Sequence, residues 1–146
     1  MDRSIIDYHL GLSCTAKDAV RILKTSLMKR QLYNQPVKPV IRSDNGPQFI
    51  SHLFGDSCVE LGVEHERIPV RTPNKNAHIE SYHAILEAEC LSRYEFQTFE
   101  EVYEVLENFV QKYNRVRIHS SLKYRPPVEC YCQLQEGTLA LKPIKL

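Results

Sequence analysis

Apolar residues recur along this chain with two alternating periods, and each change of period marks the border of a predicted element. Alternating apolar positions over residues 3–10 predict a strand, which Gly11 ends. Between residues 15 and 31 the apolar positions recur every three or four residues, the spacing of one helix face. Thr15 is a suitable N-cap, so the sequence predicts a helix directly after the first strand.

The middle of the chain repeats this order in shorter elements. Val40 and Ile41 form a short apolar strand that leads into a turn at residues 44–47, where Asn-Gly-Pro is a strong turn signal. A helix is predicted over residues 50–61, with Gly62 as its C-terminal stop. Another short strand is predicted over residues 63–68.

The last part of the chain is helical and then basic. One helix is predicted from about residue 76 to 92, and a second from 98 to 113, where Thr98 and Glu101 form a capping box. A basic tail with several prolines follows. Strands that alternate with helices indicate an α/β domain, which we place at residues 1–130, with residues 131–146 as a C-terminal tail.

Composition narrows the class of protein. The chain has 146 residues, 42% of them hydrophobic and 25% charged, which is typical of one globular domain and excludes a disordered chain. Its apolar runs are too short to cross a bilayer, and the N-terminus lacks the apolar core of a signal peptide. Five cysteines without framework spacing indicate reduced thiols, and hence a cytoplasmic protein. Cys130 and Cys132 have no second pair of ligands at zinc-site spacing.

Charge is uneven, although the net charge is only +1. Residues 80–107 are rich in glutamate, whereas residues 112–125 are strongly basic. A local basic patch of this kind can bind phosphates. A solvated helix face gives the same pattern, so both interpretations stay open at this point.

Two carboxylates occupy positions typical of a metal site. Asp44 follows the end of a short strand, where α/β sheets gather their ligands. Glu80 lies in the first turns of a helix, on the same face as Asn76 and Glu87. Mg²⁺ and Mn²⁺ bind a few carboxylates of this kind together with substrate phosphate. The alternative is local: Asp44 forms an Asx-turn, and Glu80 stabilises a helix N-terminus.

Three ordered motifs resemble those of the DDE transposases and retroviral-type integrases, especially the IS3-like insertion-sequence family. The first is residues 42–49, around Asp44. The second is residues 72–81, which lead into and past Glu80, and 35 residues separate the two carboxylates as in that family. The third runs from Tyr113 to Pro127 and has the pattern Tyr-Asn…Arg-x-His…Leu…Pro-Pro.

The resemblance implies a ribonuclease-H-like integrase core, a mixed sheet flanked by helices, in which metal-dependent DNA cleavage and strand transfer take place. By position in the motifs, Asp44 and Glu80 are expected to be catalytic ligands of Mg²⁺ or Mn²⁺ in a two-metal site. Asn76 and Lys75 are expected to contact DNA, with an exposed lysine as the alternative for Lys75. Arg117 and His119 are expected either to contact DNA or to brace the last helix against the sheet.

The resemblance also predicts an incomplete core. The family carries its first catalytic Asp upstream in a Trp-x-x-Asp context, whereas this sequence has no tryptophan and only 43 residues before Asp44. Residues 2–8 resemble the third strand of the family, so the first two strands are expected to be absent. Neither Asp2 nor Asp7 is a good substitute for the first ligand, because their strand lies away from Asp44.

Two functional readings follow from this. In the first, the chain is a transposase catalytic core of impaired activity. In the second, it is a non-catalytic remnant that binds DNA or dimerises with a full-length transposase, because absent strands leave open sheet edges that a partner, or a second copy in a homodimer, would cover.

Overall fold

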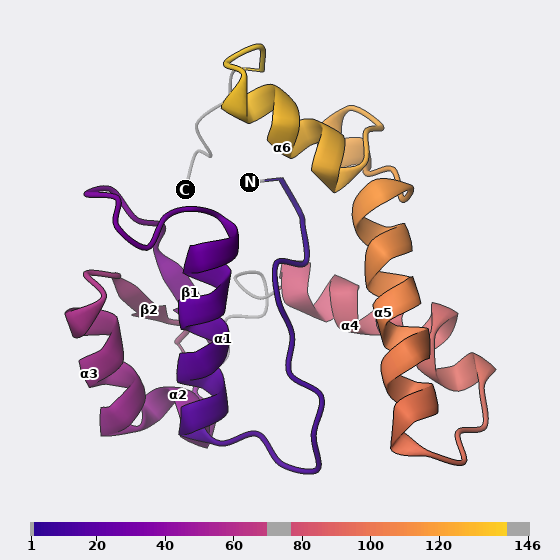
Figure 1. Ribbon diagram of the computed structural model, residues 1–146, viewed down its shortest axis with the longest axis horizontal. Coiled ribbons are helices and arrows are strands. Elements are labelled where there is room, and N and C mark those ends of the chain that lie inside the picture. Colours follow the sequence, from indigo (N-terminus) through magenta and orange to yellow (C-terminus); the bar gives the residue numbers. More distant parts are fainter. Residues whose placement is uncertain (1, 70–76, 140–146) are drawn as a thin grey trace. The chain divides into compact units, whose positions relative to one another are not determined.

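The computed structural model describes residues 2–69 and 77–139, and the chain divides into two compact units. The first, which we call the N-terminal unit, comprises residues 6–85; the second, the C-terminal unit, comprises residues 1–5 and 86–146. The N-terminal unit contains α1 (Ala16–Lys29), β1 (Ile41–Ser43), α2 (Pro47–Ile50), α3 (His52–Glu60), β2 (His65–Arg67) and the first part of α4 (Ala77–Glu89) (Figure 1). The C-terminal unit contains the end of α4, η2 (Leu91–Arg93), α5 (Phe99–Arg115), η3 (Ser120–Leu122) and α6 (Pro127–Gln135).

The sheet of the N-terminal unit consists of β1 and β2 in parallel, with Arg42 aligned to Glu66. Their side chains form an ion pair across the two strands, with Nη2 2.8 Å from Oε2. The structure therefore confirms the strands predicted at residues 40–41 and 63–68, but with other bounds. The first is shifted to residues 41–43, and the second is shorter, at residues 65–67. A parallel pair needs a crossover between its strands, and α2 with α3 supplies it.

Helices α1 and α3 pack together over one continuous core. The helix predicted over 15–31 is confirmed, because Thr15 caps α1 and the apolar stripe faces inward. The core residues are Ala19, Leu23, Leu27, Phe54, Cys58, Leu61 and Val63. Gly62 ends α3 with a φ of 65°, a conformation in which glycine has no steric penalty, so the predicted helix stop is confirmed.

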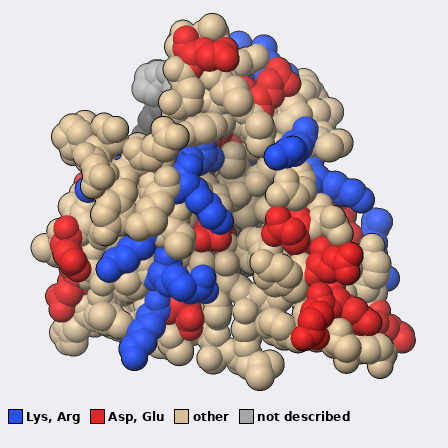
Figure 2. Space-filling model, viewed as in Figure 1, with Lys and Arg blue, Asp and Glu red and all other residues tan. Residues whose placement is uncertain are grey.

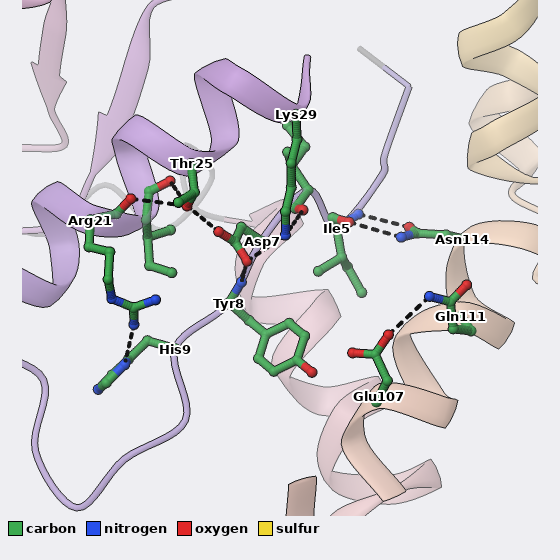
Figure 3. Close-up of polar contacts among 12 residues, drawn as sticks. Ile5, Asp7, Tyr8, His9, Arg21, Thr25, Lys29, Glu107, Gln111 and Asn114 are labelled. Atoms are coloured by element: carbon green, nitrogen blue, oxygen red, sulfur yellow. Dashed lines mark hydrogen bonds and ion pairs between the residues drawn. The ribbon is translucent and has the colours of Figure 1, made fainter. Parts of the chain in front are cut away.

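The strand predicted over residues 3–10 is wrong. These residues are not in a strand, because their polar groups bond mainly to side chains instead of to a neighbouring backbone. The Lys29 ammonium lies 2.8 Å from Asp7 Oδ1 and also donates to the Ile6 carbonyl oxygen (Figure 3). Since the described strands are only β1 and β2, the sheet is parallel and not mixed as expected.

Two helix predictions also need correction. The helix predicted over 50–61 corresponds to α3, but it begins at His52 and a separate short helix, α2, precedes it, because Ser51 adopts an extended ψ of 146° and accepts the Phe54 N–H as the N-cap of α3. The tail after residue 113 is not irregular, since α5 continues to Arg115 and is followed by η3 and α6. Pro127 starts α6 as a first-turn proline, and the border drawn between residues 130 and 131 falls inside this helix.

The described helices include none that is both long and apolar enough to span a membrane.

Candidate functional site: two exposed carboxylates and a braced basic motif

Asp44 lies directly after β1, at the carboxyl end of the parallel pair. Two hydrogen bonds hold the loop that carries it: the Ile68 N–H donates to the Ser43 carbonyl, and Asn45 Nδ2 donates to the Ile68 carbonyl at 2.8 Å. Both bonds join the end of β1 to the end of β2. The position of Asp44 is therefore fixed by the sheet and not by a free loop.

The Asp44 carboxylate forms the Asx-turn that the sequence allowed. Its Oδ1 accepts the Gly46 N–H at 2.9 Å, and its Oδ2 has no hydrogen-bond donor among the described residues. The side chain is exposed. A Cβ added at Gly46 would lie 3.0 Å from Oδ1, so a glycine here lets the backbone approach the carboxylate closely. One oxygen orients the carboxylate, and the other faces outward.

Below Asp44, a buried polar group supports the end of the strand. Ser43 is only 7% exposed, and its hydroxyl donates to the Asp44 carbonyl oxygen at 2.9 Å. Ser43 Oγ also lies 2.8 Å from His65 Nε2, in a hydrogen bond whose direction depends on the tautomer of the ring. Burial lowers the pKa of His65, with a smaller contribution from Arg67, which favours the neutral ring. The Phe54 ring meets His65 edge-on.

Glu80 lies in the first turn of α4, where the helix dipole favours a carboxylate. Its side chain is exposed and has no hydrogen-bond partner among the described residues. Glu80 and Asp44 both belong to the N-terminal unit. Within residues 2–69 and 77–139, no three His, Cys, Asp or Glu side chains group as a metal site would require. The predicted DNA contacts Lys75 and Asn76 lie outside the described residues.

Arg117 and His119 lie in the C-terminal unit and contact other residues of that unit. Arg117 Nη1 lies 2.6 Å from Glu89 Oε2, and its guanidinium carbon is 6.0 Å from the centroid of the Tyr113 ring. The His119 ring meets Tyr113 edge-on, with 5.2 Å between the centroids. Burial lowers the pKa of His119, and Arg117 adds to this effect. These contacts correspond to the bracing alternative, although the partners are helices and not the sheet.

Asn114 has a role that sequence reasoning missed. Its Oδ1 accepts the Ile5 N–H at 2.9 Å and its Nδ2 donates to the Ile5 carbonyl at 2.8 Å (Figure 3). The amide therefore pairs with residue 5 as a neighbouring strand would. Because the two residues are 109 positions apart, no local pattern indicates this contact. The Tyr-Asn pair of the third motif thus supports the C-terminal unit through both of its side chains.

Asp7 has a structural role in the N-terminal unit. It accepts hydrogen bonds from Lys29, the Thr25 hydroxyl and the Tyr8 N–H. Burial acts to raise the pKa of this carboxyl, but the hydrogen bonds, led by that of Lys29, outweigh it and the pKa is lowered. This carboxylate is therefore engaged with α1.

Comparison with known proteins relates the second and third motifs to a family. The sequence profile of the family described as integrase core domain matches residues 61–127. This segment, 67 of the 146 residues, resembles an integrase core. With the related insertion-element proteins, this match confirms the resemblance to transposases and integrases.

Related insertion-element and transposase-like proteins match this chain as well. An insertion element IS476 protein of Xanthomonas euvesicatoria is 35% identical over 89 residues, which cover 61% of this chain and 26% of that protein. A transposase-like protein of Haemophilus influenzae is 26% identical over 127 residues, which cover 87% of this chain and 57% of the relative. The chain thus spans about a quarter to just over half of the length of these relatives.

The fold of this chain is similar to that of a retroviral integrase catalytic core. The catalytic core domain of BIV integrase matches 90% of this chain and 80% of its own, with a TM-score of 0.63 and 21% sequence identity. The ribonuclease-H-like fold expected from the motifs is therefore confirmed, with a smaller sheet than expected.

Proposed function

We propose that this chain is the core of a DDE-type transposase and contributes Asp44 and Glu80 as ligands of a divalent cation at a DNA strand-transfer site. The observation that carries the proposal is the position of Asp44: an exposed carboxylate, fixed at the carboxyl end of a parallel strand pair, with one oxygen held by the Gly46 N–H and the other without a donor. Glu80 adds a second exposed carboxylate at a helix N-terminus.

The donor set fits Mg²⁺ or Mn²⁺, because both cations take oxygen ligands from one or two carboxylates together with water and phosphate. A bound cation would act as a Lewis acid on the phosphodiester. The protein contributes orientation: the Asx-turn and the Asn45 to Ile68 hydrogen bond hold the Asp44 carboxylate in place. Two carboxylates are one fewer than a shared two-metal site uses, so we expect this chain alone to have impaired activity.

For the DNA itself, we propose contacts with Lys75 and Asn76 next to Glu80, and with the basic region that begins at the end of α5. The last turn of α5 carries Lys112 and Arg115. Arg117 and His119 belong to the same region, and we infer that they position this surface through Tyr113 and Glu89, with Arg117 also adding positive charge. Phosphate binding by such a patch depends on salt. A cytoplasmic location, which the reduced thiols favour, stays a prediction.

The experiment is cleavage of a branched DNA oligonucleotide by the purified chain with Mn²⁺. We expect weak nicking or joining that Asp44→Asn and Glu80→Gln each abolish. Asp56→Asn is the matched control, because Asp56 is an exposed aspartate of the same unit outside the motifs. Activity that survives Asp44→Asn, or that Asp56→Asn removes as well, would contradict the proposed role.

The second candidate is a non-catalytic module that associates with a second copy or with a full-length transposase. The observation that favours it is the two-stranded sheet, in which both β1 and β2 have one edge without a described strand. In addition, the described side chains of α4 include none that is buried. We expect a homodimer by light scattering at micromolar concentration, and a monomer under these conditions would count against this candidate.

A further inference from the structure

A groove in the C-terminal unit lies between the end of α4, the segment around η2 and one face of α5. It consists of two adjoining hollows of about 390 and 460 Å³, which share Tyr94, Phe109 and Lys112 in their walls. Each of these volumes is within the range of about 300–1,000 Å³ usual for small-ligand sites. Nothing in the transposase motifs accounts for Tyr94 or Phe109.

The walls of the groove combine aromatic rings with cations. Tyr94 is 54% exposed and stacks on Phe96, with 5.8 Å between the centroids and 30° between the planes. From α5, Phe109 and Tyr113 form a second aromatic pair. The groove thus has aromatic rings in its walls, from Tyr94 after η2 and from Phe109 on α5, and π-faces of this kind bind nucleobases of any sequence.

The charge of the groove favours an anion. Arg93, Lys112 and Arg117 line it, together with a single carboxylate, Glu89, which is paired with Arg117. Lys112 forms no ion pair with any described residue and is exposed. Figure 2 shows that acidic side chains gather along the lower part of α5, and basic ones near its upper end. The C-terminal end of α5 is therefore the cationic one, and the free ammonium of Lys112 lies there.

We propose that this groove binds a segment of single-stranded DNA, with one or two bases stacked on Tyr94 and Phe109 and the adjacent phosphate at Lys112. The inference rests on the DNA-binding part of the proposed function and names the form of DNA bound. Bases in a duplex are stacked on each other, so only an unpaired strand offers its base faces to the aromatic side chains. Arg93, whose Nε donates to the Ala88 carbonyl at 3.2 Å, is fixed beside the same wall.

The absence of tryptophan from the sequence makes a direct test available. Tyr94→Trp places a single tryptophan in the groove, and Tyr103→Trp is its matched control, because Tyr103 is also 54% exposed but lies on α5 outside the groove. Titration with a twelve-nucleotide oligo-dT should quench the emission of Tyr94→Trp saturably and leave that of Tyr103→Trp almost unchanged. Equal quenching in both variants, or quenching in neither, would overturn the proposal.

A second set of variants separates stacking from charge. Tyr94→Ala should weaken oligo-dT binding about tenfold, as expected for the loss of one stacked base, while Tyr103→Ala binds like the parent. Lys112→Gln should lower the slope of log K against log salt by about 0.7, the value for one phosphate contact on a single strand, while Lys17→Gln on α1 leaves the slope unchanged. If the two lysine variants had equal slopes, the phosphate contact would be refuted.

Further outcomes distinguish this groove from the proposed catalytic function and from other occupants. Asp44→Asn should bind oligo-dT as the parent does, so a loss of nicking with retained quenching separates the two sites. Quenching by duplex DNA as strong as that by oligo-dT would refute the preference for single strands. A change in Tyr94→Trp emission with protein concentration alone would identify the groove as a self-association surface and overturn the proposal.

Discussion

Replacement of Asn114 by alanine tests the unexpected contact between the two chain segments of the C-terminal unit, residues 1–5 and 86–146. The Asn114 amide makes two hydrogen bonds to the backbone of Ile5, of 2.9 and 2.8 Å, and both are partly buried. A net contribution of about 1 kcal/mol for each bond predicts a loss of about 2 kcal/mol. For a chain of this size, that loss lowers the melting temperature by roughly 4–8 °C.

The matched control is Asn108→Ala. Asn108 is an exposed asparagine of the same helix, α5, and forms no hydrogen bond with a described residue, so both substitutions share the gain in helix propensity of roughly half a kcal/mol. The difference between the two variants therefore isolates the Ile5 contact. Urea unfolding gives the free energies, and hydrogen exchange of the Ile5 amide reports the local contact. Equal stability in both variants together with unchanged exchange at Ile5 would refute the pairing.

The remaining predictions concern protonation, packing and the N-terminal segment. Burial lowers the pKa of His65 and His119 in the folded chain, so below pH 6.5, the ordinary histidine pKa, the unfolded chain binds more protons than the folded one. The free energy of unfolding should therefore fall as the pH is lowered from 6.5 to 5, and urea midpoints that do not change over this range would contradict the prediction. Phe54→Ala should destabilise the chain by about 3–5 kcal/mol in urea unfolding, because Phe54 is 2% exposed in the core, and a loss below about 1 kcal/mol would show that the core is not packed as described. Asp7→Asn removes the ion pair to Lys29. Because the folded-state pKa of Asp7 is lowered, the stability that this carboxylate contributes is lost as the pH falls below 3.8, and the variant should lack that part of the acid-induced loss; an unchanged acid profile would contradict this.

Local signals predicted the helices well because their causes are local. The capping box of Thr98 and Glu101 and the cap at Thr15 are both present, since each involves residues three positions apart. Gly62 ends its helix for a similarly local reason. The N-cap at Ser51 is equally local, because its hydroxyl accepts the N–H of a residue three positions on.

Tertiary features could not be read from the sequence in the same way. Residues 3–10 have the alternation of a strand, but a strand exists only where a neighbouring backbone completes its hydrogen bonds, and Asn114 and Lys29 supply side chains instead. The groove around Tyr94 likewise depends on how η2 and α5 meet. For the candidate site, the sequence predicted that Asp44 would follow a strand and Glu80 a helix start, while the support from Ser43 and His65 came from the structure.

Calorimetric titration of the chain with Mn²⁺ tests the central claim most directly, because it asks whether Asp44 and Glu80 bind one cation together without requiring DNA or turnover. We predict measurable binding by the parent and by Asp56→Asn, and no binding by Asp44→Asn or by Glu80→Gln, since each carboxylate alone is too weak a ligand. Absence of binding in the parent, or binding that persists in either carboxylate variant, would contradict the account.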